Sequence, residues 1–421
     1  MNKEFSIDHA KNLDSNDPLA YLREQFNIPQ FKGQDAIYFT GNSLGLQHKN
    51  FDKYLNVELE DWRNKGVDGH FDAKTPWFSY HKSLAKDTAK LVGAKENEIV
   101  SMNGLSVNLH LLLTSFYQPN KTKFKILCEP NLFPSDLYIL QSQVELRGLD
   151  PSEALIFLPT NSDGVVNEYE LYASIEKHAH ELALIFIGGV NYYTGQVFDL
   201  KKIVAHGHKY NIIVGFDLAH AAGNINLELH KWNVDFASWC SYKYLNSGPG
   251  NVSSIFIHEK QIEHKPFRLS AWWGHEESTR FLIKDKFNPM PTAEGWQLSN
   301  APIFGLSIYR QSLELFNQVG MQELINKRNQ LTGYLKDSIL DLNKYSSTLR
   351  FKIITPFDTE CKGAQLSILL NERGKEVYHY LTSKGVYVDW RDPNVIRVAP
   401  VPLYNSFEDI AKFYKILLGC I

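Results

Sequence analysis

Ser238-Trp-Cys-Ser-Tyr-Lys-Tyr-Leu-Asn246 places one lysine, Lys243, just beyond an apolar run that begins at Val234. The run has the length and composition of a buried strand, and Gly248 and Gly250 follow soon after it. An ammonium group in such a place loses hydration, which favours the free amine and gives it nucleophilic or basic character. The alternative is an ordinary strand-end lysine whose ammonium group reaches solvent.

Composition limits the classes of protein to which the chain can belong. Its 421 residues carry 44 basic and 47 acidic side chains, a net charge of −3 that gives no reason to expect nucleic acid or an anionic membrane as a partner. No stretch approaches the ~20 apolar residues of a membrane-spanning helix, and the N-terminus lacks the apolar region of a signal peptide. We therefore expect an ordinary soluble globular protein with an ample core.

The chain has four cysteines, Cys128, Cys240, Cys361 and Cys420, which lie far apart and form no C-x-x-C pair. This spacing indicates neither a disulfide framework nor a zinc knuckle. A reduced, cytoplasmic setting is expected. Cys240, although next to the lysine stretch, is interpreted as a packing residue.

Two pairs of histidines, His178 with His180 and His206 with His208, suggest a metal site at first sight. On a helix, however, residues two positions apart point in different directions, whereas shared ligands need a spacing of three or four. We expect no metal.

From residue 124 onward, short apolar runs alternate with segments of helical periodicity. The apolar runs lie at 124–128, 154–158, 182–187, 212–216, 234–239 and 252–257, and helices are expected at 168–180 and 199–210. The alternation predicts an α/β fold with a mainly parallel sheet between helices, whose sites lie at the carboxyl ends of the strands.

After about residue 303 the pattern changes. Long helix is expected over 303–342 with a break near Gly320, followed by strands at 350–354, 365–369, 386–389 and 395–399. Ser406 and Asp409 have the spacing of a capping box, which predicts a final helix. We expect an N-terminal segment, 1–45, that packs with the small domain, a large domain, 46–303, and a small α+β domain, 304–421.

Several residues upstream of Lys243 fit one cofactor. Asp217 ends the preceding strand, so a carboxylate and an amine would face one cleft at the edge of the sheet. Gly104-Leu105-Ser106 precedes an apolar helix and offers free N–H groups to an anion, and Phe133 or His220 can supply a ring face. Pyridoxal phosphate requires a lysine for its aldehyde, a carboxylate for its ring nitrogen and an anion site for its phosphate.

Longer stretches around these residues share the pattern of one family. They are Tyr38 to Gln47, Asn108-Leu-His-Leu111, Phe133-Pro-Ser-Asp136, Tyr192-Tyr-Thr-Gly-Gln196, Gly215-Phe-Asp-Leu-Ala-His-Ala221, Trp239 to Asn246 and Ile396 to Phe407. They resemble kynureninase, in order, from about residue 14 to about residue 415. The resemblance implies a fold-type-I, pyridoxal-phosphate-dependent fold of the aminotransferase class V group, with a seven-stranded sheet. It also implies a homodimer with active sites shared across the interface.

The implied reaction is the hydrolysis of kynurenine or 3-hydroxykynurenine to anthranilate or 3-hydroxyanthranilate, plus alanine. Carried over by position, Lys243 is the Schiff-base lysine and Asp217 the partner of the pyridine nitrogen. Further cofactor contacts are implied for Leu105, Ser106, Phe133, Asp136, His220, Tyr242, Trp272 and Asn300, some of them from the other subunit. Tyr242 is also the candidate proton carrier, because a phenol beside the cofactor can act as acid or base.

The resemblance assigns the substrate to four residues. Arg397 would hold the α-carboxylate, and His70, Ser43 and Asn300 would line the pocket for the aryl ketone. A guanidinium suits this task because it binds a carboxylate with two parallel hydrogen bonds. Taken without the resemblance, His70 is equally an ordinary loop histidine, whereas the apolar neighbours of Arg397 already indicate a buried, partnered arginine.

Two positions depart from the family pattern. Position 106 is serine where threonine is common, and both side chains carry a hydroxyl. Position 188 is glycine where some relatives have a serine that contacts the cofactor, so this contact is not carried over. Two alternatives stay open: a cysteine desulfurase-like enzyme with Cys361 as nucleophile, and a cofactor-binding protein without turnover.

Overall fold

The computed structural model describes residues 2–282, 285–346, 348–357 and 362–421, which fold around two sheets. The larger sheet has seven strands in the order β4-β10-β9-β8-β7-β5-β6. Six of them are parallel to one another: β4 (Ile99–Met102), β5 (Lys125–Cys128), β6 (Leu155–Phe157), β7 (Leu182–Gly188), β8 (Ile213–Asp217) and β9 (Phe236–Cys240). The seventh, β10 (Ser253–Ile257), is antiparallel to β4 and β9. The prediction of a mainly parallel seven-stranded sheet is confirmed.

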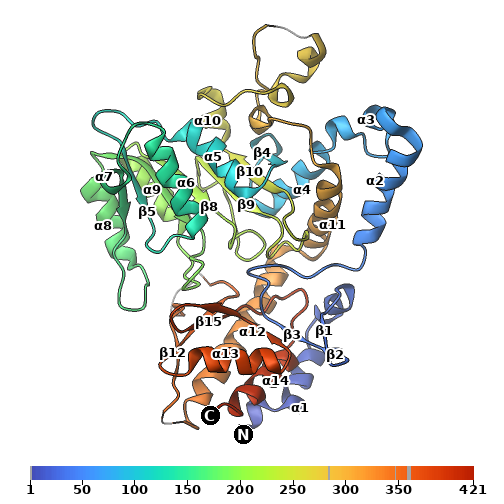
Figure 1. Ribbon diagram of the computed structural model, residues 1–421, viewed down its shortest axis with the longest axis vertical. Coiled ribbons are helices and arrows are strands. Elements are labelled where there is room, and N and C mark those ends of the chain that lie inside the picture. The colour runs from blue at the N-terminus through green and yellow to red at the C-terminus, as the bar shows by residue number, and fades with distance from the viewer. Residues whose placement is uncertain (1, 283–284, 347, 358–361) are drawn as a thin grey trace.

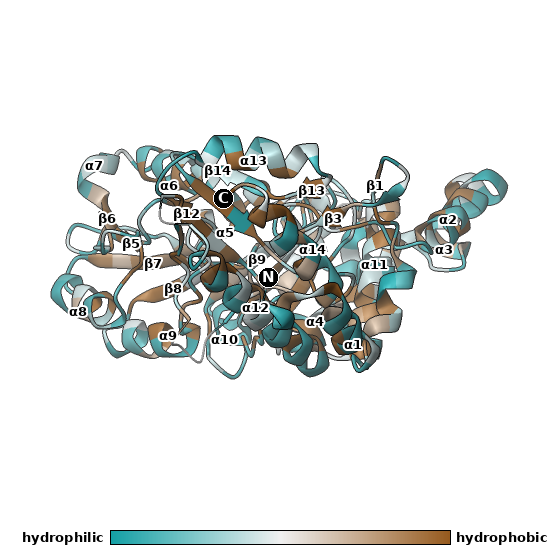
Figure 2. Cartoon of the chain, turned by 90° about the horizontal axis from the view of Figure 1, so that it is seen from below, coloured by the Kyte–Doolittle hydropathy of each residue, from teal (hydrophilic) through white to brown (hydrophobic). Residues whose placement is uncertain are grey.

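Helices cover both faces of this sheet (Figure 1). One face carries α5 (Leu105–Phe116) and α6 (Pro134–Glu145). The other face carries α4 (Lys82–Val92), α8 (Glu168–His178), α9 (Leu200–Lys209) and α11 (Ile303–Val319). Strands that are buried on both faces form continuous apolar runs, which is why they stand out in the sequence. Figure 2 shows the result, with brown strands such as β7 and β8 inside and the teal sides of the helices turned outward.

The smaller sheet, in the order β11-β12-β15-β14, is antiparallel throughout. Its strands are β11 (Phe351–Ile353), β12 (Leu366–Leu370), β14 (Asp389–Arg391) and β15 (Val395–Val398). The helices packed with it are α1 (Ile7–Ser15), α12 (Met321–Leu342), α13 (Gly374–Ser383) and α14 (Phe407–Leu418). Both chain termini lie at this end of the molecule (Figure 1).

The expected break in the long helix is confirmed, because α11 ends at Val319 and α12 begins at Met321. The two helices pack differently: α11 contacts α4 and α2 (Phe51–Lys65), whereas α12 contacts α14. The division of the chain at residues 45 and 303 stays a prediction. The expected strand 386–389 is wrong in one respect, because it is two strands with different partners.

The first of these strands, β13 (Val386–Tyr387), pairs in parallel with β3 (Ile37–Tyr38) from the N-terminal segment. The second is β14, which pairs with β15. Val388, which belongs to neither strand, separates them, and no periodicity in the sequence marks this division. We call the larger sheet with its helices the larger part, and the smaller sheet with its helices the smaller part. Through β3, the N-terminal segment is attached to the smaller part. It then runs to the larger sheet, where the Gly45 N–H donates to the Tyr242 carbonyl at 2.8 Å.

The remaining elements are short. They are β1 (Gln30–Phe31), β2 (Gln34–Asp35), α3 (Gly69–Asp72), α7 (Pro151–Ala154) and α10 (Glu259–Glu263). Helices α2 and α3 extend to one side of the molecule (Figure 1). No helix in the described ranges is both long enough and apolar enough to cross a membrane.

The capping box of α14 is confirmed and gives a first prediction. Ser406 Oγ accepts the Asp409 N–H at 3.1 Å, and Asp409 Oδ2 accepts the Ser406 N–H at 3.2 Å. Ser406→Ala should destabilise the start of α14 by about 1 kcal/mol, so its first-turn amides should exchange about fivefold faster with deuterium. Thr382→Ala is the matched control, since it removes a helix hydroxyl that bonds only the Tyr378 carbonyl at an exposed position. Equal effects of the two substitutions would contradict the assignment.

Candidate active site

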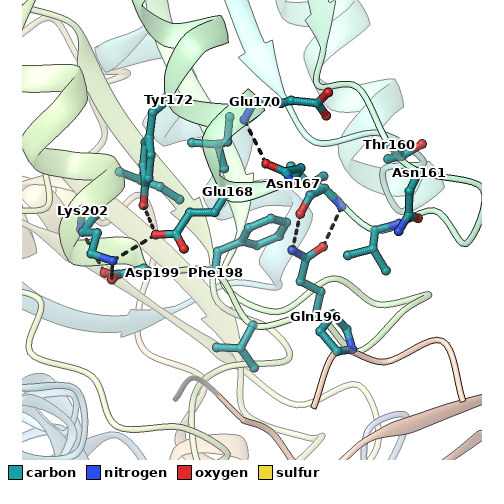
Figure 3. A pocket seen from close by; sticks show the side chains of 16 residues that line it. Thr160, Asn161, Asn167, Glu168, Glu170, Tyr172, Gln196, Phe198, Asp199 and Lys202 are labelled. Carbon is teal, nitrogen blue, oxygen red and sulfur yellow. Dashed lines mark hydrogen bonds and ion pairs between the residues drawn. The ribbon is translucent and has the colours of Figure 1, made fainter. Parts of the chain in front are cut away.

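The described residues line several cavities, and two of these differ clearly in the chemistry of their linings. The larger, about 660 Å³, lies between α8, α9 and the loop before α8 (Figure 3). Three of its charged side chains pair with each other, Lys202 with Glu168 and Asp199, and it contains none of the predicted site residues. The second cavity, about 510 Å³, lies at the carboxyl ends of the large sheet's strands. We take the second as the candidate site because of the residues it brings together.

Ten of the thirteen predicted site residues line this cavity: Ser43, Leu105, Ser106, Phe133, Asp136, Asp217, His220, Tyr242, Lys243 and Arg397. They come from both sheets and from the N-terminal segment. The remaining three, His70, Trp272 and Asn300, lie outside it in this single chain. Which of the thirteen contact a cofactor or a substrate stays a prediction.

Lys243 lies in the turn that follows β9. The strand ends at Cys240, so the lysine is not on the strand itself, and its side chain is only partly buried. Its Nζ lies 5.9 Å from the centroid of the Phe133 ring. The N-terminal segment holds this turn from the other side, and only glycine allows the approach, since a Cβ at Gly45 would lie 2.4 Å from the Lys243 carbonyl oxygen. Gly45 therefore has a packing role.

Two carboxyl groups lie at the base of the cavity, close to the lysine. Burial raises the pKa of Asp217, but the charge of Lys243 and hydrogen bonds from the Ala219 N–H and Asp136 lower it. Burial and the neighbouring Asp217 charge raise the pKa of Asp136 well above its usual value. The pKa of Asp217 is raised on balance, but that of Asp136 is raised further, so Asp136 holds a proton more readily and its hydrogen bond favours the charge on Asp217. An ionised Asp217 is what the nitrogen of a protonated pyridine ring requires.

Two ring side chains border the same space. His220 is almost fully buried, and burial together with the charge of Lys243 lowers its pKa well below the usual value, so the imidazole is neutral. Its Nδ1 has no hydrogen-bond partner within the described part of the chain. Phe133 is 43% exposed and presents its ring to the cavity, held edge-on by Tyr192 at 5.3 Å between centroids. An uncovered phenyl face and an unpaired imidazole nitrogen fit a flat polar ligand.

The start of α5 provides the expected anion site. Gly104 is its N-cap and no side chain caps it, so the first N–H groups, at Leu105 and Ser106, are free for a ligand. The Ser106 hydroxyl hydrogen-bonds that of Ser135, the second residue of α6, at 2.8 Å. Two helix starts thus meet at one end of the cavity, and both carry positive partial charge. The residues present fit the phosphate, ring and aldehyde of pyridoxal phosphate.

Arg397 reaches the cavity from β15. Its side chain is almost fully buried, and burial lowers its pKa to about 10, which leaves the guanidinium charged at neutral pH. Nη1 donates to the Tyr192 carbonyl at 2.6 Å, and Nη2 pairs with Asp389, its partner across the strands. Asp389 also binds Arg391 at 3.1 Å, a second arginine at the cavity. The prediction of a buried, partnered arginine is confirmed.

The three residues outside the cavity lie at the surface of the larger part. Trp272 is 50% exposed and donates from Nε1 to the Arg280 carbonyl, and Asn300 is exposed. His70, on α3, packs edge-on against Trp77 at 5.6 Å between centroids.

Reasoning from the sequence missed several residues that line the cavity: Asn42, Glu129, Tyr192 and Arg391. The rule that sites lie at the carboxyl ends of strands would have found Glu129, which directly follows β5. Asp389 was also missed, and no sequence signal connects it to Arg397.

Within the described ranges, one group of possible metal ligands lies close together, Glu98 with His230 and His258, away from the cavity. None of the histidines noted in the sequence belongs to it. Cys240 is buried and burial raises the pKa of its thiol, in keeping with a packing residue. Cys361, the nucleophile of the desulfurase alternative, lies outside the described residues.

Known proteins with similar sequences cover the whole chain. A family model described as the kynureninase C-terminal domain matches residues 324–417. A kynureninase from Flavobacterium psychrophilum is 49% identical over 414 residues, which cover 98% of this chain and 97% of that protein. A kynureninase from Myxococcus xanthus is 46% identical over 419 residues, covering 99% and 97%.

Solved structures with a similar fold are more distant in sequence. A cysteine desulfurase from Thermococcus onnurineus NA1 has a TM-score of 0.77 at 17% identity and covers 92% of this chain and 94% of that one. The cystine C-S lyase C-DES, solved with its product cysteine persulfide, has a TM-score of 0.76 at 16% identity, covering 92% and 99%. These structures establish the fold alone. The full-length sequence identity establishes more: the chain belongs to the kynureninase family.

Proposed function

We propose that this protein hydrolyses L-kynurenine, or its 3-hydroxy derivative, to anthranilate or 3-hydroxyanthranilate and L-alanine, with pyridoxal phosphate as cofactor. One observation carries the proposal. In a member of the kynureninase family, a single cavity holds Lys243, the carboxylate of Asp217 and the guanidinium of Arg397. When bound, pyridoxal phosphate supplies an aldehyde for the substrate amine and a ring that withdraws electrons from the substrate's α-carbon.

The larger sheet supplies the groups that hold the cofactor. With the cofactor bound, Lys243 would hold its aldehyde and, when free, would take the proton from the substrate α-carbon. Asp217 would keep the ring nitrogen protonated, helped by Asp136, whose hydrogen bond favours the charge on Asp217. Phe133 would provide a face for the ring, and the N–H groups at Leu105 and Ser106 would bind the phosphate.

Arg397 binds the substrate α-carboxylate. Two of its five N–H groups donate to Tyr192 and Asp389, which leaves three, including the buried Nε, unbonded within the described chain. Three are enough for a two-pronged contact with a carboxylate. Its existing partners fix the plane of the guanidinium before substrate arrives, which lowers the entropic cost of binding.

Tyr242 delivers a proton during cleavage. Burial, with the neighbouring Cys240, raises the pKa of its phenol, so the hydroxyl is protonated at neutral pH and has a proton to deliver. Its backbone is held by Gly45 of the N-terminal segment, which also presents Ser43 to the cavity. Ser43 is then placed to contact the aryl ketone, whose carbonyl carbon receives the water.

A homodimer completes the site. His70, Trp272 and Asn300 lie outside the cavity of their own chain, and they are assigned here to the cavity of a partner. An aromatic patch lies beside them, formed by Phe71, Trp272 and Phe281, each at least half exposed. Exposed aromatic side chains in mutual contact are typical of a surface that another protein covers.

Cleavage gives a direct test. With pyridoxal phosphate, the protein should convert kynurenine into fluorescent anthranilate, and Lys243→Ala should lower the rate at least about 10³-fold because it removes both the aldehyde anchor and the base. Cys361→Ala is the control and should keep full activity. Absence of product from kynurenine and from 3-hydroxykynurenine would refute the proposal. Loss of cysteine desulfuration in Cys361→Ala, without any kynurenine cleavage, would favour the desulfurase alternative.

Mixing inactive variants tests the shared site. Trp272→Ala/Asn300→Ala subunits mixed with Lys243→Ala subunits should recover about one quarter of full activity, because half of the dimers are mixed and each has one intact site. Lys243→Ala mixed with Asp217→Asn should recover nothing, since each site of that dimer keeps one defect. No recovery in the first mixture, with dimers and subunit exchange verified by mass spectrometry, would place Trp272 and Asn300 outside the partner's site.

A further inference from the structure

We propose that Glu129 is a positioning residue for Arg397, an assignment that rests on the proposed role of this arginine in binding the α-carboxylate. Glu129 acts through Asn191, which shapes the turn of residues 191–196. The backbone carbonyl of Tyr192 in this turn holds the guanidinium. Neither Glu129 nor Asn191 needs to touch the substrate for this purpose.

Glu129 lies directly after β5, is 5% exposed and borders the cavity. Its Oε1 accepts the Gly188 N–H at 2.7 Å, and its Oε2 accepts the Asn191 Nδ2–H at 2.6 Å. The absence of a side chain at Gly188 makes this possible, because a Cβ there would lie 2.5 Å from Glu129 Oε1. The departure from the family pattern at position 188 therefore makes room for a buried carboxylate.

Asn191 links Glu129 to the backbone of the turn. Its Oδ1 accepts the N–H groups of Tyr193 at 3.0 Å and Thr194 at 2.8 Å, and also the Thr194 hydroxyl at 3.1 Å. With the amide oxygen occupied by three donors, its NH₂ group must face Glu129. The other end of the turn is fixed by Gln196, whose side chain bonds the Val166 backbone at both its N–H and its carbonyl (Figure 3).

The turn is where the two parts of the molecule meet at the cavity. The Tyr192 carbonyl accepts Arg397 Nη1 at 2.6 Å and Gln365 Nε2 at 3.0 Å. The Tyr193 carbonyl accepts the Ser367 hydroxyl at 2.5 Å, and the Thr194 carbonyl accepts that of Thr355 at 2.5 Å. Three successive carbonyls of a turn on the larger part thus bind side chains of the smaller part. A rotation of the turn would withdraw the acceptor from Arg397.

The pKa of Glu129 depends on the two groups that donate hydrogen bonds to it. Burial raises its pKa to about 7, and the charge of Asp217 adds to the increase, while the Asn191 and Gly188 donors oppose it. A carboxylate with one donor on each oxygen is satisfied only in the ionised form, because a protonated oxygen would itself need an acceptor. Loss of either donor therefore disturbs a buried group rather than a solvated one.

Exchanging the carboxylate and the amide between positions 129 and 191 tests the hydrogen bond between Glu129 and Asn191. Glu129→Gln puts an NH₂ group against the Asn191 NH₂ or the Gly188 N–H, and Asn191→Asp puts a carboxylate against a carboxylate. In Glu129→Gln/Asn191→Asp, the amide at position 129 can accept from Gly188 and donate to the carboxylate at position 191, whose other oxygen accepts from the turn. Net charge and donor balance are then restored.

Each single variant of the cofactor-loaded dimer should raise the KM for kynurenine about tenfold with a much smaller change in kcat, because Arg397 binds the carboxylate equally in ground and transition states. The Kd for L-alanine, measured by calorimetry, should rise by a similar factor. The exchanged pair should return both values to within about threefold of the starting protein. In an Arg397→Lys background, Glu129→Gln should add less than about twofold.

Glu98→Gln is the matched control, since Glu98 is also fully buried and accepts two backbone N–H groups, but lies away from the cavity. It should lower thermal stability and leave KM unchanged.

An exchanged pair no better than the single variants overturns the positioning role, as does a Glu129→Gln effect of equal size in the Arg397→Lys background. If the unmodified protein cleaves no kynurenine, the proposed function fails, and the alanine Kd values still decide the role of Glu129. If Glu129→Gln does not fold, Asn191→Asp and the exchanged pair carry the same comparison.

Discussion

A carboxylate remains ionised away from water only where donors and a positive charge compensate for lost hydration, and Asp217 has both. The Ala219 N–H, the Asp136 proton and the Lys243 charge come from the turn after β8, from α6 and from the turn after β9. These groups meet only if β8 and β9 are neighbours with parallel direction, as they are. The order of strands in the larger sheet therefore sets the electrostatics of the site.

The sequence predicted the larger sheet well because its strands are buried on both faces. Runs such as 182–187 and 212–216 have no polar face to interrupt them, so their positions could be inferred, and their alternation with helices predicted a mainly parallel sheet. The smaller sheet was harder. The run 386–389 divides into β13 and β14, and this division depends on a partner strand, β3, that lies about 350 residues away in the chain.

In the candidate site, the residues that could be predicted are those whose expected role is a direct contact with the cofactor or the substrate. Lys243 and Asp217 could be paired from their positions after neighbouring strands, and the start of α5 from its glycine. Glu129 and Asp389 were not found, because each acts by holding another side chain, and such contacts depend on the fold rather than on local sequence. That His70, Trp272 and Asn300 lie outside the cavity of their own chain was not predicted residue by residue, because local sequence does not show where each loop lies in the fold.

Carboxylates and guanidinium groups reach the cavity from different sides. Glu129 and Asp217 come from the larger part, where the charge of Lys243 lies close to Asp217, whereas Arg391 and Arg397 come from the smaller part, with Asp389 between them. A zwitterion placed between the two parts would direct its nitrogen to the acidic side and its carboxylate to the basic side. The turn of residues 191–196 connects the two sides, because Glu129 accepts a hydrogen bond from the Asn191 side chain of this turn and Arg397 donates to its Tyr192 carbonyl. The link between the acidic and basic groups therefore runs through the backbone of this turn and through side chains that each make at least two hydrogen bonds, which restricts the distance between these groups.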